Sequence, residues 1–228
     1  MNIYEIYKAV EFYLNKDQFG RHFPVTKFNS MIPVVEIDLF KQRYGLPQEY
    51  FPGMPIPRMS YEITQKISDD VSPMKVWLGS PQGTSALSVG SDGLAQLPVD
   101  YVHFSSARTM EDYPIEMLMD AQFNERLLNP NRTPSRRYPI MTRYGNHLMF
   151  APKDLTKVHF IYLRPPKHAH LAVTIDPVND VEVYDPQNSR DTEFPIDMHT
   201  EYIRRMLMNM GVNIRSELIM QYSNAPEK

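Results

Sequence analysis

Residues 72–79 have the sequence Ser72-Pro-Met-Lys-Val-Trp-Leu-Gly79, and here the pattern of apolar residues changes from helical to extended. Before this point, apolar side chains recur every three or four positions, beginning with Ile3, Ile6 and Tyr7, which predicts amphipathic helices. After it, short alternating runs bounded by glycine and proline predict strands. The helical spacing returns at Pro195, a residue type that is well tolerated in the first turn of a helix.

This order of helices, then strands, then helices decides the fold class. Segregated runs are typical of α+β proteins, whereas α/β proteins alternate their helices and strands. We therefore predict an α+β fold in which residues 1–72 and 195–228 together form one helical bundle domain. Residues 73–194 are predicted to form an inserted antiparallel β module, similar to a sandwich or a barrel. The 228 residues are enough for a sizeable hydrophobic core.

Local signals refine the first helical part. Thr26 is a predicted N-cap for a second helix that ends at Tyr44-Gly45. Pro33 either kinks this helix or marks its true start. Residues 46–58 contain four prolines, so we expect an extended connection there.

Turn signals divide the β module into strands. Asp92-Gly93 is a strong hairpin signal, and it is predicted to join strands at 87–89 and 94–97. Residues 147–150 and 158–163 are predicted to be two strands around a turn. Residues 115–128 have a mixed period that fits a strand followed by a short helix.

Composition excludes several classes of protein. The chain has 24 Lys and Arg residues against 27 Asp and Glu, a net charge of −3, which disfavours general binding to nucleic acid phosphates. The absence of cysteine excludes disulfides, thiol nucleophiles and cysteine metal ligands. No stretch approaches the ~18 to 20 apolar residues that span a bilayer. With Glu5 and Glu11 near its start, the chain lacks the pattern of a signal peptide, so we expect it to fold in the cytoplasm.

The sequence also lacks the common catalytic motifs. It contains no phosphate-binding glycine loop, no G-x-S-x-G nucleophile elbow and no H-E-x-x-H zinc motif. His168 and His170 lie two residues apart and, in a strand, would share a face, where His159 is the nearest third ligand for a metal. The alternative is a polar strand after a proline turn, which we favour. We predict no catalytic, cofactor-binding or metal site.

Four stretches carry a resemblance to a known family. They are Met1-Asn-Ile-Tyr-Glu-Ile-Tyr7 with Asn15-Lys-Asp-Gln-Phe-Gly20; Asp92-Gly-Leu-Ala-Gln-Leu-Pro-Val-Asp-Tyr-Val-His103; Arg137-Tyr-Pro-Ile140 with His147-Leu-Met-Phe-Ala-Pro152 and Val158-His-Phe-Ile-Tyr-Leu-Arg-Pro-Pro166; and Glu193-Phe-Pro-Ile-Asp-Met-His199 with the predicted helix that follows it and ends Met210-Gly-Val-Asn-Ile214. In this order, the chain resembles the adaptor proteins that join the portal to the tail in tailed bacteriophages. These include tail tubular protein A of short-tailed phages and the ring proteins of crAss-like phages that infect Bacteroidetes.

The resemblance implies a structural protein of the virion that is not an enzyme. Its copies would form a ring, a dodecamer of about twelve subunits, between the portal protein and the next tail or ring protein. The DNA would pass through the channel without sequence-specific binding, and acidic side chains in the lumen would let it slide. The ring would lie in the neck of the virion, be assembled in the host cytoplasm and contact no membrane.

Candidate contact residues follow from the last helices and from one loop. Methionine is common at surfaces that repack, so we assign a subunit or portal interface to part of the C-terminal helical region, with core packing as the alternative. The candidates are Met198, Tyr202, Met206, Met210, Ile214 and Tyr222. Arg136, Arg137 and Arg143 are candidate loop contacts for an acidic neighbouring subunit or a DNA phosphate, with a solvated loop as the alternative.

Two other functions remain open at this point. The chain could be another structural component of the virion, a capsid-decorating or tail-fibre-attachment protein, whose β module does the binding. It could also be a small hydrolase or a metal-dependent enzyme, if the histidines at 159, 168 and 170 converge with a carboxylate. Residues 46–58 and the tail 223–228 are expected to become ordered by neighbouring subunits in the ring.

Overall fold

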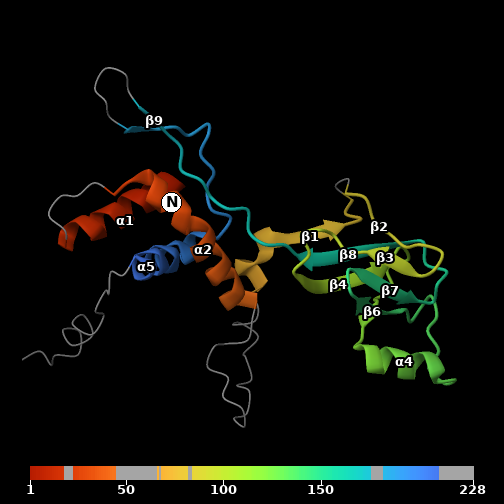
Figure 1. The fold of residues 1–228 in the computed structure, drawn as a ribbon. Coiled ribbons are helices and arrows are strands. Elements are labelled where there is room, and N and C mark those ends of the chain that lie inside the picture. The colour runs from red at the N-terminus through yellow and green to blue at the C-terminus, as the bar shows by residue number, and fades with distance from the viewer. Residues whose placement is uncertain (18–22, 45–65, 67, 82–83, 176–181, 211–228) are drawn as a thin grey trace, which may run out of the picture. The chain divides into compact units, whose positions relative to one another are not determined.

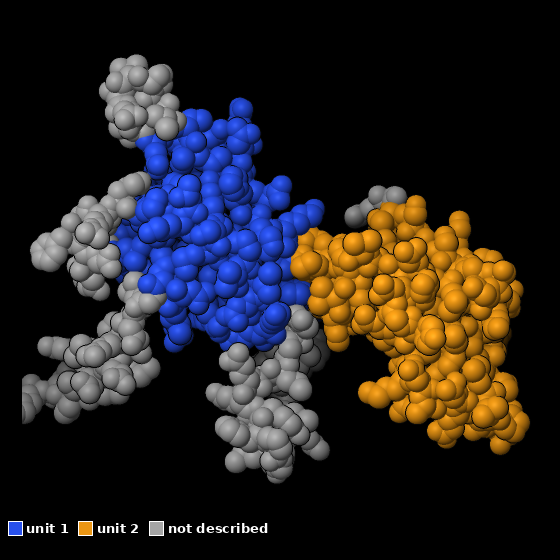
Figure 2. Space-filling view, viewed as in Figure 1, with its two compact units in different colours: residues 1–73, 166–228 blue, residues 74–165 orange. Residues whose placement is uncertain are grey.

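The computed structural model describes residues 1–17, 23–44, 66, 68–81, 84–175 and 182–210. The chain mixes helices with sheets whose described strands pair antiparallel except for one parallel pair, which confirms the coarse prediction of the fold (Figure 1). It forms two compact units: unit 1 comprises Met1–Pro73 and Pro166–Lys228, and unit 2 comprises Met74–Pro165 (Figure 2). Residues 166–194, which the sequence pattern assigns to the β module, therefore belong to unit 1.

Unit 1 contains three α-helices in its described residues. They are α1 (Ile3–Asp17), α2 (Val25–Tyr44) and α5 (His199–Asn209), and a short 3-10 helix, η2 (Ile196–Met198), leads into α5. Helix α5 lies against both α1 and α2, so helices from the two ends of the chain share one core (Figure 1). A second 3-10 turn, η1 (Ser72–Met74), lies where the chain leaves unit 1. None of the helices in the described ranges is both long and apolar enough to cross a bilayer.

The start of α1 is fixed by side chains that satisfy its free backbone N–H groups. The Asn2 side chain accepts a hydrogen bond from the Glu5 N–H (2.8 Å), and the Glu5 carboxylate accepts one from the Asn2 N–H (3.1 Å). This reciprocal pair is a capping box. Asp191, far along the chain, accepts a hydrogen bond from the Ile3 N–H at 2.7 Å. Its negative charge also suits the positive end of the helix dipole.

Helix α2 begins one residue before its predicted cap. The Pro24 carbonyl accepts hydrogen bonds from the N–H groups of Lys27 and Phe28, so Thr26 lies inside the first turn and does not cap the helix. Pro33 lies within the helix and does not start it. Proline lacks an N–H, so the helix gives up one backbone hydrogen bond there.

Polar side chains of α2 hold the segment that returns from unit 2. The Asn29 amide accepts a hydrogen bond from the Leu171 N–H (3.0 Å) and donates one to the Leu171 carbonyl (2.8 Å). Two turns along the same helix face, the Glu36 carboxylate accepts a hydrogen bond from the Ala169 N–H at 3.2 and 3.3 Å. Together the two side chains form hydrogen bonds with backbone groups of this extended segment, as a neighbouring strand would in a sheet.

Glu36 is the central buried polar group of unit 1. Its side chain is fully buried, and it also meets His168 Nδ1 at 3.0 Å and the Tyr202 hydroxyl at 3.4 Å. Burial raises the pKa of the Glu36 carboxyl above its ordinary value of 4.5, while the hydrogen bonds from His168 and Ala169 act against this rise. Burial, followed by the charge of Glu36, raises the pKa of Tyr202, which therefore stays protonated and donates.

The returning segment then forms a two-stranded ribbon. Strands β9 (Val173–Ile175) and β10 (Glu182–Tyr184) pair antiparallel, with Val173 opposite Tyr184. The Tyr184 ring stacks on Tyr4 of α1 at 4.8 Å between centroids. Contact with a helix stabilises such a ribbon, because two strands alone are marginal in water.

Unit 2 contains two four-stranded sheets that share one hydrophobic core. In the first sheet, β8 (Lys157–Leu163) is central: it pairs with β1 (Lys75–Leu78) and β2 (Leu87–Ser88) along one edge and with β4 (His103–Thr109) along the other. The second has the order β3 (Leu94–Gln96), β7 (His147–Ala151), β6 (Ile140–Tyr144), β5 (Glu116–Met117). Alternate residues of β8, Val158, Phe160 and Tyr162, point into the core with Leu148 and Phe150 of β7.

The predicted turn at Asp92-Gly93 forms, but it does not make a two-stranded hairpin. Gly93 has a positive φ of 83°, and the Gly90 N–H donates to the Leu94 carbonyl at 2.8 Å. Beyond this turn the flanking strands separate: β2 pairs with β8, and β3 pairs with β7. The strands β7 and β8 are likewise in different sheets, so both turns carry the chain from one sheet to the other.

The second sheet is covered on its other face by α4 (Asp120–Leu128). Phe123 of this helix packs on Ile140 and Ala151, and the Thr142 hydroxyl donates to the Asp120 carboxylate at 2.8 Å. The predicted strand-then-helix pattern of residues 115–128 is thus confirmed by β5 and α4. The two faces of this sheet are both buried, one on the shared core and one on the helix.

The burial of Glu36 should make the stability of the fold depend on pH. Its pKa is higher in the folded than in the unfolded chain, so the stability it contributes is complete below about pH 4.5 and is lost as pH rises through the folded value. Glu36→Gln cannot ionise and keeps an acceptor for the Ala169 N–H. We expect its free energy of urea unfolding, relative to the natural chain, to improve as pH rises from 4.5 to neutrality.

Glu36→Leu is the matched control for this experiment. It leaves the Ala169 N–H and the Tyr202 hydroxyl without their acceptor, so it should be less stable than Glu36→Gln by about 2–4 kcal/mol at every pH. Parallel pH profiles for the natural chain and Glu36→Gln would contradict the assignment of the raised pKa to this carboxyl.

Candidate subunit interface

The methionine-rich face of α5, predicted as an interface, is the core of unit 1. Met198, Tyr202 and Met206 are between 0% and 1% exposed, so the predicted contact is wrong for these three side chains. These residues form the apolar face of an amphipathic helix, and α1 and α2 of the same chain cover that face. Met210 is half-buried at the end of α5, and Ile214 and Tyr222 lie outside the described residues.

Arg205 attaches α5 to α2 beside this core. Its guanidinium forms an ion pair with Asp38 and donates to the Gln42 side-chain oxygen at 2.7 Å. Glu201, one turn earlier on α5, accepts from Arg205 Nε at 3.1 Å and fixes the direction of the side chain. The adjacent residues Arg204 and Arg205 therefore have different roles. Arg205 joins two helices, whereas Arg204 is exposed and pairs only with Glu201 among the described residues.

The exposed face of α2 carries apolar side chains in its middle. We call it the α2 outer stripe; its members repeat with helical spacing and are Lys27, Ser30, Val34, Ile37 and Lys41. Val34 is 59% exposed and Ile37 37% exposed, between lysines near both ends of the helix. The spacing was visible in the sequence, because these positions lie opposite Phe28 and Ile32, but the sequence does not say which of two apolar faces is covered.

A second exposed face belongs to α1. We call it the α1 outer stripe, and its members are Met1, Glu5, Lys8 and Phe12. Phe12 is 68% exposed, and its ring meets that of the exposed Tyr13 edge to face at 5.7 Å between centroids. Lys8 pairs with Glu11 at 2.9 Å. This stripe thus combines an aromatic pair at one end with an acidic residue at the other.

The three candidate arginines of unit 2 contact different parts of the unit. Arg136 is exposed and pairs with Asp154 at 2.6 Å. Arg143 lies over the Tyr101 ring, 5.4 Å from its centroid, and donates to the Gly145 carbonyl at 3.2 Å. Arg137 is exposed in the loop before β6. Two of the three are therefore engaged within unit 2, and the sequence cluster does not become a single basic patch.

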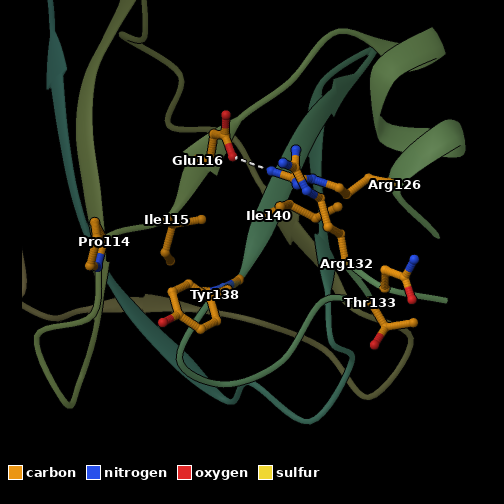
Figure 3. Close-up of a pocket in the computed structure, with 10 residues that line it drawn as sticks. Pro114, Ile115, Glu116, Arg126, Arg132, Thr133, Tyr138 and Ile140 are labelled. Carbon is orange, nitrogen blue, oxygen red and sulfur yellow. Dashed lines mark hydrogen bonds and ion pairs between the residues drawn. The ribbon is translucent and has the colours of Figure 1, made fainter. Parts of the chain in front are cut away.

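A hollow in unit 2 lies beside α4 and has a volume of about 640 Å³ (Figure 3). It is lined by Pro114, Ile115, Glu116, Arg126, Asn131, Arg132, Thr133, Tyr138, Pro139 and Ile140. Ile115 and Ile140 are buried and form an apolar floor, whereas Glu116 and Arg126 form an ion pair of 2.9 Å at the rim. We call it the α4 pocket. The sequence does not reveal this pocket, because its residues come from a helix, two strands and loops that share no periodic signal.

The histidines singled out as metal ligands have other partners. His168 meets Glu36, and His170 forms a backbone bridge with Arg190 in unit 1, whereas His159 belongs to unit 2, where its ring lies 6.5 Å from that of Trp77. In the described ranges, no group of three or more histidine, aspartate or glutamate side chains lies close enough to hold a metal ion.

Comparison with known sequences adds no family. The chain matches no protein-family model and no curated protein sequence.

The assignment of α5 to the core can be tested with two methionines of the same helix. Met206 is fully buried and Met208 is 54% exposed. Met206→Ala should lower the free energy of unfolding by about 2–5 kcal/mol, because it opens a cavity. Met208→Ala should change it by no more than about 0.5 kcal/mol. Equal effects in urea unfolding would contradict the packing of α5 described here.

Proposed function

We propose that this chain is a non-enzymatic structural protein of a tailed bacteriophage. Its copies form the ring that joins the portal to the tail and extends the DNA channel. In this proposal the helices of unit 1 act as one helical bundle, and unit 2 is the antiparallel β module inserted into it. The ring lies in the neck of the virion, between the portal protein and the next tail component.

The observation that carries the proposal is the pair of outer stripes on unit 1. Large apolar side chains that are exposed together on a helix mark surfaces that a partner covers. Phe12 and Tyr13 on α1, and Val34 and Ile37 on α2, are exposed in this way. Two helices that each expose apolar side chains in the described part of the chain fit a subunit with more than one neighbour.

The two stripes are chemically different, which favours head-to-tail contact. The α2 outer stripe has lysines at positions 27 and 41 around its apolar centre. The α1 outer stripe has Glu5, an aromatic pair and a single lysine, Lys8, which is paired with Glu11. An aromatic pair can pack on Val34 and Ile37 while Glu5 faces a lysine. Contacts between unlike surfaces generate a ring when the rotation between copies closes.

The charge of the chain suits a channel that DNA must traverse. A net charge of −3 supplies no excess of cations to hold phosphates, and a mildly acidic lumen lets DNA slide. Two of the three candidate arginines of unit 2 are already engaged with Asp154 or Tyr101, which also fits a surface that does not grip DNA.

Assembly should depend on the α2 outer stripe. Val34→Glu places a carboxylate at the centre of the proposed contact, where an unpaired charge is desolvated, so self-association should weaken roughly tenfold or more. The measurement is light scattering coupled to size exclusion, over a range of protein concentrations, with a phage portal ring added in a second series.

Val99→Glu is the matched control, since Val99 is also an exposed valine, 104% exposed in unit 2 against 59% for Val34. It should assemble as the natural chain does. If Val34→Glu and Val99→Glu assemble equally well, the α2 outer stripe is not a subunit contact. If the assembly has a symmetry lower than that of an adaptor ring, the protein is a decorating or fibre-attachment component instead.

A further inference from the structure

The α4 pocket has the shape and chemistry of a peptide-binding site. Its volume of about 640 Å³ lies within the usual range of ligand sites, roughly 300–1,000 Å³. The floor is apolar, and the side wall includes Pro114 and the Tyr138 ring, which is 77% exposed (Figure 3). An aromatic wall beside proline and isoleucine suits an apolar or proline-rich segment.

The rim of the pocket provides one uncommitted positive charge. Arg126 is neutralised by Glu116 at 2.9 Å. Arg132 borders both this pocket and the smaller hollow next to it, where Glu125 also lies. Within the described part of the chain, the Arg132 guanidinium makes no ion pair or hydrogen bond. A ligand with a carboxylate next to its apolar group would satisfy this arginine and fill the floor at once.

The chain itself contains a segment of this chemistry. Residues 46–58 have the sequence Leu46-Pro-Gln-Glu-Tyr-Phe-Pro-Gly-Met-Pro-Ile-Pro-Arg58. Glu49 is followed at once by Tyr50 and Phe51, so a carboxylate and two aromatic rings are adjacent. Four prolines restrict the backbone in advance, which lowers the entropy lost on binding and is typical of ligands for aromatic-lined grooves.

We propose that the α4 pocket receives residues 46–58 of a neighbouring copy of the chain. An aromatic side chain, Tyr50 or Phe51, rests on the floor formed by Ile115 and Ile140, and Glu49 pairs with Arg132. The inference rests on the proposed function in one respect, the presence of neighbouring copies. Each copy offers one segment and one pocket, so the exchange is a head-to-tail contact of the kind that closes a ring.

Directed disulfide formation tests this directly, because the natural chain contains no cysteine. Full-length Gln48→Cys, next to Glu49, is mixed with full-length Thr133→Cys, on the pocket rim, under mild oxidation. We expect a disulfide-linked pair of chains. Ser91→Cys, exposed in unit 2 and not among the residues that line the pocket, replaces Thr133→Cys in the control mixture and should give a yield roughly tenfold lower.

Charge reversal in these cysteine variants tests the proposed ion pair. Arg132→Glu alone, or Glu49→Arg alone, should reduce the cross-linking rate several-fold, and the two together should restore it. Arg132 is exposed, so its replacement should leave the fold intact.

The following outcomes overturn the inference. They are equal yields with Thr133→Cys and Ser91→Cys, no rescue by the double charge reversal, or a disulfide that forms only within one chain when Gln48→Cys and Thr133→Cys are combined. Failure of the inference is distinguishable from failure of the proposed function. A ring that assembles without selective cross-linking leaves the function standing, and selective cross-linking without a ring supports the pocket alone.

Discussion

The arrangement of the elements in unit 1 depends on two side chains of α2 that form hydrogen bonds with the backbone of another segment. Asn29 and Glu36 hold residues 169–171, the segment that follows the return of the chain from unit 2. Burying a carboxylate without partners would cost free energy. The two oxygens of Glu36, however, have three partners: the Ala169 N–H, the His168 ring and the Tyr202 hydroxyl. Because Tyr202 belongs to α5, the same carboxylate ties the returning segment and the last helix to α2.

Local pattern was sufficient to predict much of the fold. The three-and-four spacing found α1 and α2, and alternation found β8, because burial of one face imposes those periods on any sequence. The pairing of the strands could not be predicted from the sequence. Strand β6 was missed because its buried residues, Ile140 and Met141, are consecutive, one facing α4 and the other the shared core. The turn at Gly93 was found, yet its strands join different sheets, since strand partners are chosen by the core and not by the turn.

The candidate site was predicted less well, for a physical reason. Met206 on a helix has the same sequence signature whether its partner is α2 of the same chain or a neighbouring subunit, and only the fold shows that the partner is internal. Phe12 and Val34 are exposed, and they lie outside the row of apolar residues that each helix turns toward the core. The α4 pocket has no sequence signature, because Arg132, Tyr138 and Ile115 come together only through the fold. The ring itself remains a proposal, supported by these surfaces and by the resemblance in sequence.

The most direct test of that proposal is the mass of the assembly. Native mass spectrometry of the purified full-length protein, alone and mixed with a phage portal ring, should be combined with negative-stain images of the same samples. The account predicts a closed ring of about twelve copies, formed either alone or only on the portal. A strict monomer at all concentrations, which also ignores the portal, would contradict it.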